Sequence, residues 1–123
     1  MYIDTHAHLN LEPFCKDPEP YIERAVNAGV RRIIVPGIDL KTSEKAIELA
    51  EMFEVVFAAA GIHPQDSGKA ESGYLKHIES FLQHPKVLAV GEGGMDHFRD
   101  YAPRDRQLRV FREQAELAKA YDC

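Results

Sequence analysis

The chain has 123 residues, of which 45% are hydrophobic and 28% are charged, so its length and composition predict one globular domain over residues 1–123. Its formal net charge of −5 argues against a protein that holds nucleic acid through a broad basic face, but it allows a nuclease whose bound divalent cations supply positive charge. No run reaches the ~18 consecutive apolar residues of a membrane span, and the first residues lack the basic and apolar regions of a signal peptide.

Four short apolar runs predict β-strands. The runs read, in chain order, YID, RRIIVPGI, VVFAAAGI and VLAVGEG. The last three runs are nearly continuous, which is typical of parallel strands that are covered on both faces. If residues 2–8 form a strand, His6 and His8 project to the same side of the sheet.

Helical patterns lie between and after these runs. We expect the first helix to end at Gly29, the second to be capped by Asp39 or Thr42, and the third to stop near Pro85. The expected helices have apolar stripes at helical spacing: Tyr21, Ile22, Ala25 and Val26; Ala46, Ile47, Ala50 and Phe53; Leu75, Ile78 and Leu82; and Leu108, Phe111, Ala115 and Ala118.

Four βα units in series predict an α/β fold with a parallel sheet and right-handed crossovers. Two architectures fit this pattern. One is a small open doubly wound sheet, and the other is part of a TIM barrel, (β/α)8, which typically needs ~250 residues. The length favours the first architecture, whereas the polar residues that follow the strands favour the second.

Polar side chains follow every predicted strand, at the edge where parallel α/β folds place their sites. Glu92 directly follows VLAV, and a partly buried carboxylate is costly unless it is paired or binds a metal. Arg31 and Arg32 begin the second run and are expected at the opposite edge, so a metal is the better partner. His6, His8 and Glu92 together suit Zn, Mg or Mn, with a position left open for water.

Three further residues at this edge have open roles. His63 is a metal ligand, a group that contacts phosphate, or a loop histidine fixed by Pro64. Asp4 either orients an imidazole or caps the end of the strand. Asp96 is a general base, a group that supports the ligands, or a turn residue beside Gly94.

Other motifs are absent from the sequence. GEGG is too short for a phosphate-binding loop and carries an acid where phosphate would approach, and there is no G-x-S-x-G elbow. Cys15 and Cys123 form no C-x-x-C pattern, so we expect free thiols and a cytoplasmic protein.

The segments IDTHAHLN, GIHP, GEGGMD and RQLRVFREQAELAK resemble, in order and spacing, the N-terminal half of the TatD family of metal-dependent deoxyribonucleases. These proteins are metal-dependent hydrolases with (β/α)8 barrels. The resemblance implies that His6 and His8 bind one metal ion and that Glu92 bridges it to a second. It also implies that His63 faces the substrate phosphate, while Asp96 and Gln107 support the site.

The sequence departs from the family's pattern in two respects. Gly93 stands where the family usually has a bulky aliphatic residue, and the chain ends at Cys123, about where the family begins its fifth strand. We therefore expect only the first four βα units of the barrel, a half barrel. The encoded protein is expected to be longer, its C-terminal half completing the barrel; otherwise two copies pair, or the half closes as a small doubly wound domain.

The leading hypothesis for function is a TatD-type deoxyribonuclease that hydrolyses DNA or another phosphodiester with a metal-activated water, using two divalent ions in the full-length family. The chain alone is expected to hold at most one ion and to have little or no nuclease activity. The alternatives are a metal-dependent amide, ester or lactone hydrolase of the same superfamily, a phosphoesterase whose fold also opens with a His-x-His strand, and a non-catalytic half-barrel assembly module.

Overall fold

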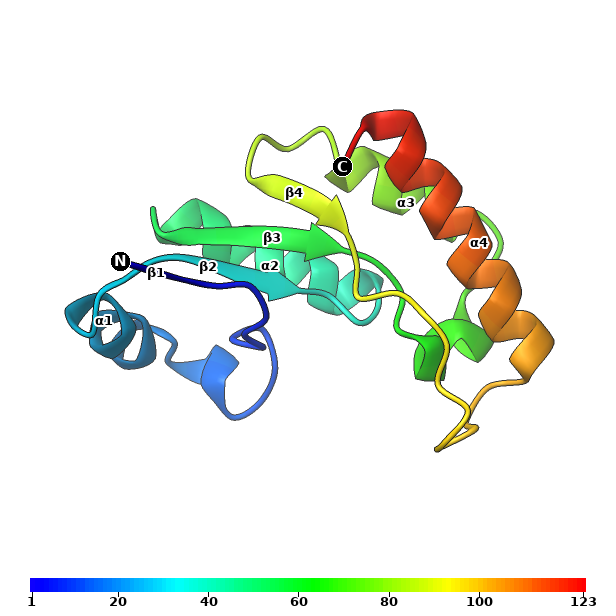
Figure 1. The fold of residues 1–123 in the computed structure, drawn as a ribbon, viewed down its shortest axis with the longest axis horizontal. Helices are drawn as coiled ribbons and strands as arrows, with labels where there is room; N and C mark the ends of the chain where they lie inside the picture. Colours follow the sequence, from blue (N-terminus) through cyan, green and yellow to red (C-terminus); the bar gives the residue numbers. More distant parts are fainter.

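The computed structural model describes residues 1–123 as a four-stranded parallel sheet flanked by helices (Figure 1). Its strands lie in the sheet in sequence order. A doubly wound sheet reverses its strand order at a switch point, whereas a barrel adds each strand beside the previous one. The chain therefore has the fold of four consecutive βα units of a TIM barrel, a half barrel. This is the second of the two architectures predicted from the sequence. The strands are β1 (Tyr2–Asp4), β2 (Val30–Pro36), β3 (Val56–Ala60) and β4 (Val87–Val90).

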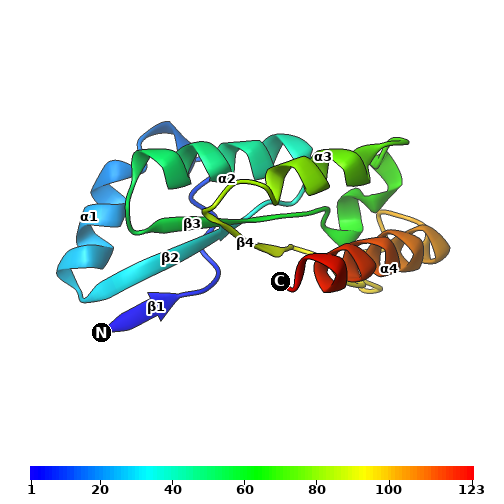
Figure 2. The ribbon, with the colours of Figure 1, turned by 90° about the horizontal axis from the view of Figure 1, so that it is seen from above.

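The helices are distributed unequally around the sheet. The helices are α1 (Glu19–Asn27), α2 (Leu40–Met52), α3 (Tyr74–Phe81) and α4 (Arg104–Tyr121), and short 3₁₀ helices η1 (Phe14–Lys16) and η2 (Pro64–Lys69) lie in the connections. Figure 2 shows α1, α2 and α3 along one side of the sheet and α4 beyond β4. None of the helices combines the length and the apolar character needed to span a bilayer.

The predicted helix ends agree with the structure at two positions. Gly29 follows the end of α1 with φ of +94°, a left-handed conformation that glycine adopts without steric cost. Asp39 caps α2, because its side chain accepts the backbone N–H of Thr42 at 2.7 Å in a capping box.

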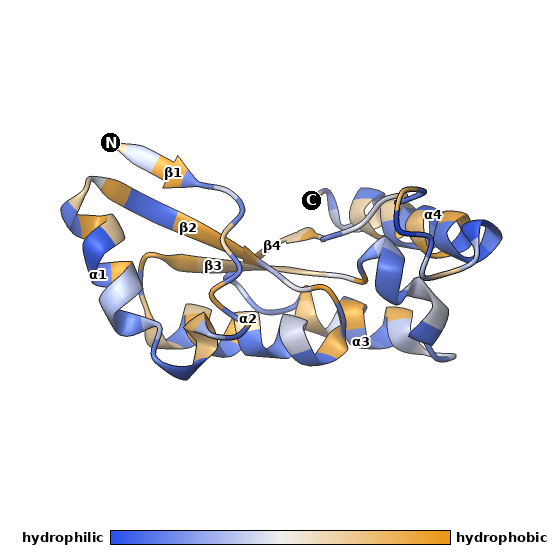
Figure 3. Ribbon diagram, turned by 90° about the horizontal axis from the view of Figure 1, so that it is seen from below, coloured by the Kyte–Doolittle hydropathy of each residue, from blue (hydrophilic) through white to orange (hydrophobic).

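Helices cover only one face of the sheet, whereas the apolar runs predicted two covered faces. Ile33, Val35 and Ala58 are buried in the core on the helix side. On the other face Phe57 is half-buried and Leu88 is exposed. Figure 3 shows hydrophobic residues along β2 and β3. The runs are apolar on both faces because the second face of a barrel sheet packs into the barrel interior, which four strands leave open.

The first strand is shorter than predicted, because β1 ends at Asp4 and not at His8. The Asp4 carboxylate accepts the backbone N–H of His6 at 3.1 Å, which caps the strand end and turns the chain. Pairing with β2 resumes at Ala7, whose N–H donates to the carbonyl of Ile34 at 3.1 Å. The two histidines therefore flank an anchored residue in a loop and still face the same way.

The predicted buried face of α4 is wrong. Leu108 and Phe111 are 38% and 40% exposed, whereas Gln107, Val110 and Gln114 are buried. Hydropathy assigns leucine and phenylalanine to the core, but the two glutamines are buried because their amides satisfy backbone groups of other segments.

Candidate metal centre

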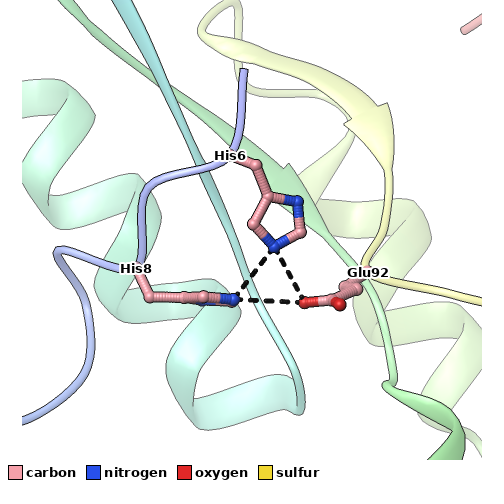
Figure 4. A group of neighbouring side chains, drawn as sticks. All are labelled: His6, His8 and Glu92. Atoms are coloured by element: carbon pink, nitrogen blue, oxygen red, sulfur yellow. Dashed lines mark hydrogen bonds and ion pairs between the residues drawn. The ribbon is translucent and has the colours of Figure 1, made fainter. Parts of the chain in front are cut away.

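Three side chains from the two edges of the sheet converge at the carboxyl ends of the strands (Figure 4). The Nε2 atoms of His6 and His8 lie 3.1 Å apart. Glu92 Oε2 lies 3.3 Å from Nε2 of His6 and 3.2 Å from Nε2 of His8. The structure thus brings together the three residues that the sequence proposed as metal ligands.

The chain after β4 reaches the histidines by crossing the end of β3. Gly91 donates its N–H to the carbonyl of Ala60 at 3.0 Å, and Glu92 donates its N–H to the carbonyl of Gly37 at 2.8 Å. Gly61 permits this crossing, because a Cβ on it would lie 2.7 Å from the carbonyl carbon of Gly91. The crossing carries Glu92 from β4 to the end of β2, beside the histidine loop.

Asn10 fixes the histidine loop from the other side, although it was not predicted from the sequence. Its buried side-chain amide donates to the carbonyls of Pro36 and Thr42, at 2.9 Å each. These carbonyls belong to the end of β2 and the first turn of α2. The signal in the sequence is a polar residue two positions after His8.

The arrangement of donor atoms fits a divalent cation. Glu92 Oε2 is inaccessible to solvent and accepts no hydrogen bond, although two imidazole nitrogens lie within 3.3 Å of it. An unpartnered buried carboxylate oxygen is costly, and a cation would satisfy it. Ligand atoms that lie ~2.1 Å from an ion are about 3.4 Å apart in a tetrahedral shell and about 3.0 Å apart in an octahedral one. The observed separations of 3.1–3.3 Å lie between these values, so Zn, Mg and Mn all fit.

His63 lies beside His6, His8 and Glu92, but its ring nitrogens are oriented differently from those of the other two histidines. Its Nδ1 accepts the backbone N–H of Gln65 at 3.1 Å, so a neutral ring carries its proton on Nε2. Nε2 lies 3.7 Å from Glu92 Oε1, the carboxylate oxygen that the other two histidines do not approach. A protonated Nε2 donates a hydrogen bond and does not coordinate a cation, so this geometry favours contact with an anion over metal ligation.

Asp96 occupies the turn position that was one of its three predicted roles. Its carboxylate accepts the backbone N–H groups of Phe98 and Arg99, at 3.0 and 3.2 Å, and pairs with the Arg99 guanidinium at 3.3 Å. The side chain of Gln65 and these backbone groups hold the pKa of Asp96 below its ordinary value. Asp96 is thus a loop-forming carboxylate, and it is not among the three converging groups.

Gln107 holds the same loop from α4. Its Oε1 accepts the N–H of Asp96 at 2.8 Å, and its Nε2 donates to the carbonyls of Asp96 and Ala102, at 3.1 and 2.9 Å. The side chain is fully buried. Gln107 therefore closes residues 96–102 into a compact loop beside the site.

A cleft of about 560 Å³ opens onto the converging groups. Lys69, Arg99 and Tyr101 in its wall were not predicted from the sequence. They lie in the connections that follow the predicted strand ends, and this position is the only sequence signal for them. The lining residues are His8, Ile38, His63, Gln65, Asp66, Lys69, Glu92, Arg99 and Tyr101.

The sequence profile of the family described as TatD related DNase matches residues 3–123. The chain belongs to this TatD family. Its TatD relatives include the uncharacterized metal-dependent hydrolase YabD of Bacillus subtilis, which is 44% identical over 97% of this chain and 47% of YabD. The 3'-5' ssDNA/RNA exonuclease TatD of Escherichia coli is 30% identical over 94% of this chain and 44% of its own length.

A solved TatD structure confirms the predicted fold. The crystal structure of YjjV, a TatD homolog from Escherichia coli, has a TM-score of 0.90 to this chain at 39% identity. The match covers 98% of this chain and 48% of YjjV. The chain thus spans about half the length of the TatD proteins it matches, and the predicted resemblance to the N-terminal half of that family is confirmed.

Proposed function

We propose that this chain carries the histidine and glutamate ligands of one metal ion in a TatD-type deoxyribonuclease, a hydrolase of DNA phosphodiesters. The observation that carries the proposal is the convergence of His6, His8 and Glu92, whose ligand atoms are 3.1–3.3 Å apart at the mouth of an open cleft. Nucleic acid as the substrate rests on the relatives that are named 3'-5' ssDNA/RNA exonucleases.

The proposed ligands differ in charge and therefore contribute differently to metal binding. His6 and His8 offer neutral imidazole nitrogens, and Glu92 offers a negative oxygen that balances part of the charge of a divalent ion. A divalent ion held there supplies Lewis-acid chemistry toward water and a phosphoryl oxygen. Glu92 Oε1 lies 3.7 Å from His63 Nε2 and is not approached by the other two histidines, so this oxygen would be available to a second ion.

His63 is proposed to bind the substrate phosphate. Its Nε2–H faces the cleft beside Glu92 and is oriented by the bond from Gln65 to Nδ1. A fixed donor at this point stabilises the charge that develops on the phosphoryl oxygens. Asp96 and Gln107 are proposed to act indirectly, by holding the loop that forms one wall of the cleft.

The chain by itself is proposed to bind a single ion and to have little or no nuclease activity. Its converging group contains three ligands, whereas a two-metal mechanism needs a second set of ligands that holds a second ion ~3.5–4 Å from the first. A further segment of the same protein, or a second copy of this chain, is proposed to supply that set across the open face of the sheet. Both cysteines are free, in agreement with the proposed cytoplasmic location.

The test compares substrates and sites in the product of the complete reading frame that encodes these residues. We expect cleavage of single-stranded DNA in Mg²⁺ or Mn²⁺ that EDTA abolishes and that exceeds cleavage of a carboxylic ester, a lactone and an amide. Glu92→Ala should abolish the activity while the circular dichroism spectrum is unchanged, and Glu23→Gln on the exposed surface of α1 is the matched control. Faster cleavage of the ester, lactone or amide would instead assign the alternative hydrolase function.

A further inference from the structure

We propose that residues 95–103, the rim loop, form a platform on which Phe98 and Tyr101 stack the unpaired bases of a single-stranded nucleic acid beside the metal centre. The proposal deepens the proposed function, because it rests on nucleic acid being the substrate of that site. It assigns a recognition role to two aromatic residues outside the ligand set.

The first observation is the exposure of two large rings on one short loop. Phe98 is 94% exposed and Tyr101 is 77% exposed. Neither ring stacks on another aromatic side chain of the chain or receives a cation over its face. Single exposed apolar residues are common, but two largely exposed aromatic rings on one short loop, one of them lining the cleft of a candidate active site, are typical of a binding surface.

The second observation is that the loop is held rigid without help from these rings. The buried Gln107 amide bonds to both ends of the loop, at Asp96 and Ala102. The backbone N–H of Tyr101 donates to Gln65 Oε1 at 2.9 Å. The loop backbone is thus fixed by hydrogen bonds to the side chains of Gln107 and Gln65. The rings are therefore available to a ligand, and little ordering entropy is lost when they bind it.

The third observation is location. Tyr101 and Arg99 line the same cleft as His8, His63 and Glu92. A strand whose phosphate approaches the metal centre therefore passes the rim loop within the same cleft. Bases of a single strand expose their faces to aromatic side chains, whereas bases inside a duplex are already stacked on each other.

The charges around the loop also favour stacking as the source of affinity. Arg99 pairs with Asp96 at 3.3 Å, and Lys69 pairs with Asp66 at 3.6 Å, so each cation of the cleft already has a carboxylate partner. Affinity that came from free lysines and arginines would fall steeply with salt. Stacking on Phe98 and Tyr101 predicts a shallow salt dependence and a requirement for bases.

The experiment measures binding without cleavage. Fluorescence anisotropy with a labelled oligothymidylate is recorded in EDTA for the product of the complete reading frame. The proteins are the wild type, Phe98→Ala and Tyr101→Ala, and the ring-conserving Phe98→Tyr and Tyr101→Phe. Each alanine variant should weaken binding by about tenfold, and each conservative variant should retain it. Because both side chains are exposed, thermal unfolding should be the same in all five proteins. Tyr2→Ala, at the amino end of β1 and 67% exposed, is the control for loss of an exposed ring elsewhere.

Two further ligands make the outcome decisive. An abasic oligonucleotide with the same number of phosphates should bind weakly to the wild type, and a duplex of the same sequence should bind no better. Unchanged affinity in both alanine variants, equal affinity for the abasic strand, or no binding of the oligothymidylate would each overturn the proposal. Failure of the proposed nuclease function would be distinguishable from failure of this stacking proposal. In that case base-dependent binding would persist, but the complete gene product would cleave no phosphodiester in Mg²⁺ or Mn²⁺.

Discussion

Glu92 donates its backbone N–H to the carbonyl of Gly37 at 2.8 Å, although Gly37 follows β2 and Glu92 follows β4. The bond spans the end of β3, where Gly61 presents bare backbone to Gly91. The position of the glutamate in the candidate metal centre therefore depends on the absence of a side chain at a residue that is not itself a ligand.

Gly61→Ala should displace Glu92 and weaken metal binding at least tenfold. The added Cβ would lie 2.7 Å from backbone and 2.8 Å from Gln114 Oε1, so the backbone must shift, at a cost of about 1–3 kcal/mol in stability. Isothermal titration with Zn²⁺ and urea unfolding measure the two effects. Gly93→Ala is the matched control, since its Cβ would meet Gln114 Nε2 at an ordinary 3.5 Å; equal metal affinity in both variants would refute the role of the crossing.

Glu92→Gln should remove stabilisation by metal without destabilising the metal-free chain. In the wild type, a divalent ion at 100 times its Kd raises the free energy of unfolding by about 2.7 kcal/mol, because it binds only the folded state. The variant keeps the shape of the side chain and removes a charge whose Oε2 has no hydrogen-bond partner. Thermal unfolding with and without Zn²⁺ or Mn²⁺ tests this, and a metal-induced rise in Tm that persists in the variant would contradict the ligand assignment.

His63→Asn should reduce kcat of the complete gene product by about 10²–10³-fold while leaving metal affinity near the wild-type value. The asparagine oxygen replaces Nδ1 as the acceptor for Gln65, so the start of η2 is preserved and only the Nε2–H is lost. Steady-state kinetics on single-stranded DNA and metal titration separate the two roles. A large loss of metal affinity would instead identify His63 as a ligand.

Gln114→Leu should cost about 3 kcal/mol of stability, because two buried backbone groups lose their partners. In the wild type Oε1 accepts the N–H of Ile62 at 2.7 Å, and Nε2 donates to the carbonyl of Ile62 at 3.1 Å. Urea unfolding measures the loss. Leu108→Gln on the exposed face of the same helix is the comparison and should change stability by less than about 0.5 kcal/mol.

Asp96→Asn should make the chain less sensitive to acid. The pKa of Asp96 is lowered from 3.8 by the Gln65 side chain and by the backbone N–H groups of Phe98 and Arg99. A depressed carboxyl pKa contributes stability that is present above pH 3.8 and is lost as the pH falls through the folded-state value. Urea unfolding between pH 5 and about pH 3 should therefore show a steeper loss in the wild type than in the variant, and parallel curves would count against this assignment.

Sequence periodicity predicted the number of strands, their parallel direction and the caps of two helices, because these features depend on residues near one another in the chain. It failed on α4, where Gln107 and Gln114 are buried and Leu108 is exposed. A buried glutamine is stable only when its amide finds backbone partners, and those partners, Asp96, Ala102 and Ile62, lie in other segments. The end of β1 was also misplaced, since a side-chain bond from Asp4 turns the chain before the histidines.

The residue types of the candidate site and the edge at which they gather were determined by the sequence by itself, because parallel strands bring their carboxyl ends to one edge whatever their separation along the chain. Only the tertiary structure decided that His6, His8 and Glu92 meet within 3.3 Å and that His63 turns a protonated nitrogen toward them. It also decided that Tyr101 lines the same cleft, with Phe98 exposed on the same loop. Those relations depend on where the backbone after β4 crosses the end of β3 and on which hydrogen bonds close the rim loop. Such distances between remote segments are set by packing and leave no periodic trace in the sequence.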